Sequence, residues 1–171
     1  MKLSPQDFQQ TKQIANIIKY CDKADLKSLE QITDEIYRHQ PFLLSLFLGY
    51  REDVNQYELD EILRILIIIW LFFRYQPNVK KTRISMKMFD NRQKKNVTFL
   101  RYLDGEKSQH SKNQLILDNL GALKSKALFT AVLFKVNEGA ALKKLDKNIS
   151  GIMILGMKSL IECFEQICKI K

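Results

Sequence analysis

The residues with the most chemical promise are a run of cations in the middle of the chain, interleaved with aromatic side chains. The candidate nucleic-acid-binding residues are Lys80, Lys81, Arg83, Lys87, Arg92, Lys94, Lys95 and Arg101. Lysine and arginine pair with phosphates, and aromatic rings at Phe89, Phe99 and Tyr102 would stack on bases if they were exposed. The alternative is a helix whose cations form a solvated face and whose aromatic residues belong to the core.

A near-motif for nucleotide binding places Lys158 and Ser159 shortly after Gly156. A phosphate-binding loop needs its lysine directly after the second glycine, so that backbone amides and the ammonium surround the phosphates. Here Met157 intervenes, the residues between the two glycines are large and apolar, and no strand pattern precedes them. We therefore expect a helix in which Gly151 and Gly156 allow close packing, and no nucleotide cofactor.

Residues that bind metals are few and scattered. The two histidines are His39 and His110, and the three cysteines are Cys21, Cys163 and Cys168. Zinc sites combine cysteine and histidine at short spacings, and helical di-iron sites need paired Glu-x-x-His repeats, which are missing from the sequence. An odd cysteine count without a repeated spacing favours a reducing compartment. We expect core cysteines, no metal and a cytoplasmic protein.

Catalytic groups are equally sparse. Helical ribonucleases of the HEPN type are similar to this chain in size and helicity, and they use a closely spaced arginine and histidine. The nearest such pair here, Arg101 and His110, has eight residues between its members, so the motif is missing. Tyr102, Glu106 and His110 are the best remaining participants in a catalytic site that only the fold could assemble.

The composition favours one helical domain, which we assign to residues 1–171. Three prolines and six glycines in 171 residues are few for a β-sandwich or barrel. The most apolar stretch, residues 65–73, is much shorter than the roughly 20 residues of a membrane-spanning helix. No apolar run follows Met1, so we expect neither a secretory signal nor a membrane span.

The net charge of +9 is unevenly distributed. Residues 1–73 carry 8 Lys/Arg against 11 Asp/Glu, residues 74–107 carry 10 against 3, and residues 108–171 carry 10 against 5. An acidic front and a basic middle fit binding to nucleic acid or to a membrane surface, attraction between two halves of one fold, or contacts between protomers.

The first part of the chain predicts two helices. Ser4 and Pro5 suit a helix start, and a stripe from Phe8 to Cys21 gives a buried face. The next helix begins near residue 25 and ends before Pro41, because the residue before a proline is pushed out of helical geometry. Residues 42–48 are apolar throughout and fit either a strand or a short helix that starts at Pro41.

The strongest helix signal covers residues 53–73. Asp53 with Gln56 resembles a capping box. Glu58, Asp60 and Glu61 are explained by the positive end of the helix dipole better than by acid–base chemistry. Residues 62–73 are apolar on every side, which predicts a central helix.

Helical spacing continues over residues 79–103, 115–120, 123–134 and 148–167. Together the segments predict an all-α, bundle-like domain of about six to eight helices.

Three functions remain open. Our main hypothesis is a helical protein-interaction or scaffold domain without catalytic activity, because no catalytic motif is present and residues 42–48 and 62–73 are rich in large apolar side chains. This hypothesis predicts a protein partner or self-association. The alternatives are a nucleic-acid-binding module that uses residues 80–102, and an enzyme with a site assembled from scattered residues.

Overall fold

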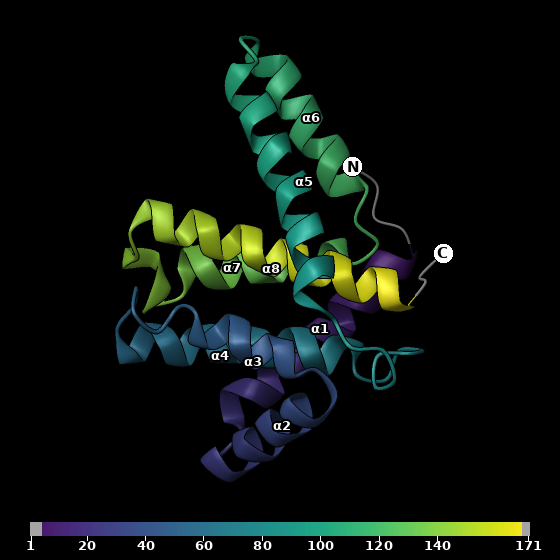
Figure 1. Ribbon diagram of the computed structural model, residues 1–171, viewed down its shortest axis with the longest axis vertical. Coiled ribbons are helices and arrows are strands. Elements are labelled where there is room, and N and C mark those ends of the chain that lie inside the picture. Colours follow the sequence, from purple (N-terminus) through teal and green to yellow (C-terminus); the bar gives the residue numbers. More distant parts are fainter. Residues whose placement is uncertain (1–4, 169–171) are drawn as a thin grey trace.

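The computed structural model describes residues 5–168, which form eight α-helices and one short 3₁₀ helix (Figure 1). In chain order these are α1 (Pro5–Lys23), α2 (Leu26–His39), α3 (Pro41–Leu48), α4 (Gln56–Phe73), α5 (Met86–Gly105), α6 (Gln109–Gly121), α7 (Lys126–Glu138), η1 (Leu142–Lys144) and α8 (Lys147–Cys168). No strand occurs within residues 5–168, and the prediction of an all-α, bundle-like fold is confirmed.

The central helix is α4, as its apolar sequence predicts. Every side chain over residues 65–73 is buried. Asn55 and Glu58 form a capping box at its N-terminus, in which each side chain accepts a hydrogen bond from the other residue's backbone N–H. The capping box predicted at Asp53 and Gln56 is therefore wrong, because Asn55 is the residue that directly precedes the first helical turn.

Helices from both the first and the last part of the chain pack against α4. It contacts α1, α2 and α3 as well as α7 and α8. Between α4 and α8, the rings of Phe73 and Phe164 stack with centroids 4.8 Å apart. Figure 1 shows α2 at one end of the longest axis, and α5 with α6 at the opposite end.

Helix starts and ends follow local chemistry. Asp25 caps α2 by accepting a hydrogen bond of 2.9 Å from the Ser28 N–H. Residues 42–48 lie in α3 and not in a strand, and Pro41 occupies a first-turn position where its missing N–H costs no hydrogen bond.

The buried stripe of α1 is shorter than expected. Ile14 and Cys21 are buried, but Phe8 is exposed, so its assignment to the core is wrong. Sequence spacing places a residue on a helix face, whereas the length of that face that a neighbour covers depends on the fold. The predicted cap at Ser4 lies outside the described residues.

The glycines of the near-motif lie inside α8 and not in a loop. Gly156 is buried against Tyr50, and a β-carbon at this position would lie 2.6 Å from the Tyr50 hydroxyl. Gly151 faces open space, so the prediction of close packing is confirmed for Gly156 and wrong for Gly151. Within residues 5–168, no helix combines the length and the hydrophobicity that crossing a bilayer requires.

Candidate functional site on the α5–α6 arm

The helices α5 and α6, with residues 106–108 between them, project together from one end of the molecule (Figure 1). We refer to residues 86–121 as the arm. Ser85 caps α5 and Ser108 caps α6, each by accepting a hydrogen bond from the backbone N–H three residues later. The arm contacts the rest of the molecule mainly where α5 packs on α8.

Buried residues spaced by seven attach α5 to the molecule. They are Phe89, Asn96 and Leu103, and seven residues are close to two helical turns, so the three share one face. Phe89 belongs to the main core, whereas Asn96 is an amide with only 5% of its surface exposed. A buried amide needs hydrogen-bond partners, and α8 supplies them.

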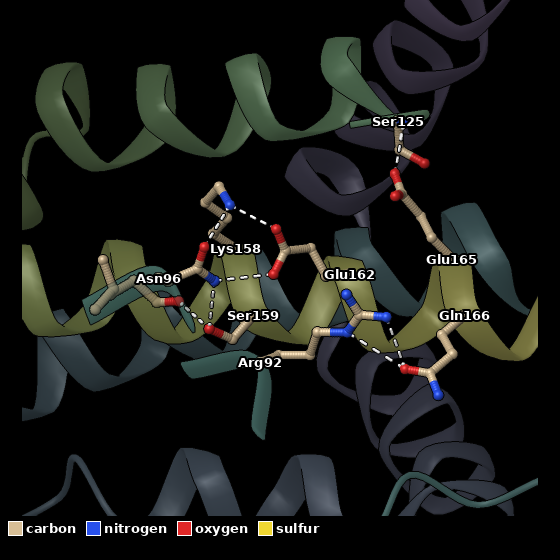
Figure 2. Close-up of polar contacts among 9 residues, drawn as sticks. Arg92, Asn96, Ser125, Lys158, Ser159, Glu162, Glu165 and Gln166 are labelled. Atoms are coloured by element: carbon tan, nitrogen blue, oxygen red, sulfur yellow. Dashed lines mark hydrogen bonds and ion pairs between the residues drawn. The ribbon is translucent and has the colours of Figure 1, made fainter. Parts of the chain in front are cut away.

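Figure 2 shows these partners. The Asn96 Oδ1 accepts a hydrogen bond of 2.6 Å from Lys158 Nζ. The Asn96 Nδ2 donates to Ser159 Oγ at 3.0 Å and to Glu162 Oε2 at 2.9 Å. Lys158, 7% exposed, also donates to Glu162 Oε1 at 2.5 Å, and Ser159 Oγ donates to the Leu155 carbonyl at 2.8 Å. Because the amide, ammonium, hydroxyl and carboxylate are all paired, this α5–α8 network positions the arm and offers no reactive group.

The opposite face of α5 is a line of cations. Lys87, Lys94 and Arg101 are also spaced by seven. Each lies two residues before one of the buried residues, which corresponds to about 200° around the helix. All three are exposed, and no ion pair in the part of the chain that the structure describes involves them. Lys95 is exposed beside Lys94. At 1.5 Å per residue, the line extends over about 21 Å.

Three of the predicted cations lie in the loop before the arm, over residues 74–85. Lys80 pairs with Glu35 at 2.6 Å, and Arg83 donates to a backbone carbonyl of α2 at 3.3 Å. Although burial opposes ionisation, hydrogen bonds from Lys80 and Trp70 hold the pKa of Glu35 below its ordinary value. Lys81 is exposed. The segment 80–102 is therefore not one continuous surface, and the exposed cations gather on α5, where Asp90 lies on the same face between Lys87 and Lys94.

A basic groove of about 380 Å³ lies where α5 meets α8. Lys87, Arg92 and Lys95 line it together with Gln166, and no carboxylate does. Arg92 donates from Nε and from a terminal nitrogen to Gln166 Oε1, at 3.3 and 2.9 Å (Figure 2). Three cations without an acidic neighbour suit a phosphate or carboxylate group.

The arm also leaves apolar side chains in water. No residue of α6 is buried, and Ile116 and Leu117 are 40% and 53% exposed. On α5, Leu100 and Tyr102 are 43% and 60% exposed. A helix of 13 residues is only marginally stable alone in water, and packing normally covers one of its faces. The arm thus combines uncovered apolar side chains with unpaired cations.

The cysteines have no chemical role that their surroundings support. All three are free and buried, which confirms their prediction as core residues. Burial raises the pKa of Cys21 and of Cys168 to about 11, and that of Cys163 to about 12, so the nucleophilic thiolate is scarce near neutral pH. Within residues 5–168, no three His, Cys, Asp or Glu side chains lie close enough together to hold a metal ion.

The three residues considered for a scattered catalytic site lie in or near the turn between α5 and α6. Tyr102 and His110 are exposed near the tip of the arm. Glu106 accepts a hydrogen bond of 2.9 Å from the Ser108 N–H in the turn between the two helices. None of the three lines the grooves beside α5.

The residues that hold the arm in place were not among the predicted site residues. Asn96 lies midway between Phe89 and Leu103 on an apolar face, and that spacing is a signal for a buried polar contact. Lys158 and Glu162 are recognisable as a helical pair four residues apart, but their burial under α5 is not encoded in the spacing.

No family model, curated protein or solved structure matches this chain.

Proposed function

We propose that the protein is a helical interaction domain that binds a protein partner, or a second copy of itself, through the arm. The observation that carries the proposal is α6, a helix of 13 residues with no buried side chain. Its exposed Ile116 and Leu117 lie on an element that projects from the molecule, where a partner has free access. Exposed apolar surface of this kind marks protein–protein contact sites.

A second uncovered surface supports the same role. A groove of about 520 Å³ between α1 and α7 has an apolar lining that includes Ile14, Ile18, Ala127 and Phe134. The Phe134 ring is exposed at this groove. Burying such surface is the main favourable contribution to association between proteins. We also place the protein in the cytoplasm, since three free and buried cysteines suit a reducing compartment.

Site-specific photo-cross-linking in cells tests the role of the arm. Tyr102 and Leu117 are each replaced by a photoreactive phenylalanine analogue, and Lys144, an exposed residue of η1, serves as the control position. We expect light-dependent protein adducts from both arm positions and none from position 144. Arm positions that give no adduct, or adducts that form equally at all three positions, would contradict the proposed function.

Nucleic-acid binding is the second candidate, and the line of cations on α5 favours it. Lys87, Lys94, Lys95 and Arg101 are exposed on a projecting helix without ion-pair partners in the described part of the chain. Each cation that neutralises a phosphate releases a condensed counterion, so affinity falls with salt. Four contacts to duplex DNA predict a loss of about 100-fold between roughly 50 and 200 mM salt.

Fluorescence anisotropy with labelled single- and double-stranded oligonucleotides measures this loss. We expect Lys87→Glu with Lys94→Glu to abolish binding while the helical circular dichroism signal persists. The control replaces Lys80 and Arg83 by glutamine, because both already have partners on α2. Unchanged binding in the α5 variant would remove nucleic acid from the candidate functions.

A further inference from the structure

Figure 1 shows α2 at the end of the molecule opposite the arm. Residues of α2 and α4 line an acidic groove of about 360 Å³. Its lining includes four apolar residues, Leu26, Leu29, Leu63 and Ile67, which we refer to as its floor. Leu26 is 73% exposed, so this apolar surface is open to a partner.

Carboxylates surround this floor. Glu30 and Asp34 on α2 and Asp60 on α4 line the groove and are exposed. Asp60 accepts a hydrogen bond from Gln56 and has no cationic partner among the described ion pairs. Arg64 is the one cation in the lining, and it donates to the Cys21 carbonyl at 2.8 Å. An occupant of the acidic groove should therefore carry an apolar anchor with cations beside it.

The tip of the arm has this chemistry. The Tyr102 ring is 60% exposed on α5. Arg101 adjoins it in sequence, and Lys95 lies about two turns earlier on the same side of α5; both cations are exposed. Tyrosine is among the residues that most often anchor protein interfaces, because it buries a large ring at a low cost in conformational entropy.

We propose that the arm of one copy docks in the acidic groove of a second copy, with Tyr102 on the apolar floor and with Lys95 and Arg101 facing the carboxylates. The arm and α2, which lines the acidic groove, lie at opposite ends of the longest axis in Figure 1, so an arm does not reach its own groove. The contact is therefore intermolecular. This proposal rests on the proposed interaction function and identifies the partner as a second copy of the chain.

The charge distribution along the chain supports a second copy as the occupant. The arm carries seven Lys/Arg against four Asp/Glu, and residues 25–39, which include α2, carry two against four. The two surfaces are thus complementary in charge and in apolar content, and every copy carries both. Two copies can then be joined by one arm–groove contact, or by two reciprocal contacts in which each arm occupies the groove of the other copy.

Complementation between two variants tests the contact. The arm variant combines Lys95→Glu, Arg101→Glu and Tyr102→Ala, and the groove variant combines Glu30→Lys and Asp34→Lys. Molar mass is measured by light scattering and analytical ultracentrifugation at about 100 µM protein and low salt, where surface charges are least screened. Circular dichroism checks that each variant remains helical.

We expect the wild-type protein to form dimers or larger assemblies. Each variant alone should lose at least about 100-fold in affinity, because removing an anchor and reversing its flanking charges act together. A mixture of the two variants retains one intact arm and one intact groove, so it should regain a dimer. Lys87→Glu on the same helix and Asp53→Lys, an exposed residue outside the groove, are controls that each reverse one charge, and both should assemble like the wild type.

A monomeric wild-type protein, or a mixture that stays monomeric, would overturn the proposed contact. Cross-linking of position 102 to a different protein in that situation would preserve the interaction function and reject only the second copy as partner. Oligonucleotide binding that is lost in the arm variant, together with a monomeric mixture, would assign the same cations to nucleic acid instead.

Discussion

Replacing Asn96 by alanine removes the amide that joins α5 to α8 and leaves the neighbouring helical residues unchanged. Three hydrogen bonds are lost, and two of them involve the charged groups of Lys158 and Glu162. A hydrogen bond to a charged group contributes about 1.5–3 kcal/mol and a neutral one about 1 kcal/mol. Complete loss of all three would cost about 4–7 kcal/mol.

The surviving contacts reduce this cost. Lys158 and Glu162 keep their mutual hydrogen bond of 2.5 Å, and Ser159 keeps its bond to the Leu155 carbonyl. Water can also enter the vacated space. We therefore expect Asn96→Ala to lower the free energy of unfolding by about 3 kcal/mol, and the melting temperature by about 6–12 °C for a chain of this length.

Urea denaturation measures the global effect, and hydrogen exchange shows where the molecule opens. Because this network attaches the arm, amides of α5 should lose protection at lower free energy than those of α4. Asn91→Ala, on the exposed side of α5, is the control and should change stability by no more than about 0.5 kcal/mol.

A further variant separates polar pairing from packing. Asn96→Leu combined with Lys158→Met and Glu162→Leu removes the amide and both charges of the α5–α8 network together. This triple variant should recover much of the stability that Asn96→Ala loses. A loss below about 1 kcal/mol for Asn96→Ala, or equal loss of protection in α4 and α5, would refute the role assigned to the network.

Other substitutions test individual contacts and pKa shifts. Gly156→Ala should destabilise by about 1–3 kcal/mol through its clash with Tyr50, whereas Gly151→Ala, in open space within α8, should stabilise by about 0.5–1 kcal/mol in thermal unfolding. Burial raises the pKa of Glu165, so stability falls as pH rises from its unfolded to its folded pKa; Glu165→Gln should be more stable than wild type in urea at about pH 7 and equal to it at about pH 4. At Glu35, burial opposes ionisation but the hydrogen bonds prevail and lower the pKa, so the stabilisation is present above the unfolded pKa and disappears as pH falls through the folded pKa. Glu35→Gln should therefore reduce stability at about pH 7 and have little effect at about pH 3, and equal losses at both values would contradict that account.

Most of the helices could be predicted from the sequence because their signals are local. The apolar run over residues 62–73 predicts the central helix, and the short side chains at Asp25 and Ser108 suit helix caps. Predictions failed where two local interpretations compete. Asp53 and Asn55 are both good caps, and only the structure distinguishes them. Phe8 is apolar at a core spacing, yet no neighbouring helix covers it.

The candidate site was predictable only in part. The cations of α5 are visible in the sequence, but so are Lys80 and Arg83, which the fold uses in contacts with α2. Sequence spacing places Lys87, Lys94 and Arg101 on one face of α5, and the packing of α8 against the opposite face is what leaves them in water.

The sequence by itself determined the all-helical fold, the central position of α4 and the unequal distribution of charge along the chain, because these follow from residue type and spacing of a few turns. Tertiary structure alone decided that Asn96 and Lys158 are buried together, that no residue of α6 is buried, and that α2 and the arm lie at opposite ends. These properties depend on which helices meet, and that choice is made by packing between residues far apart in the chain.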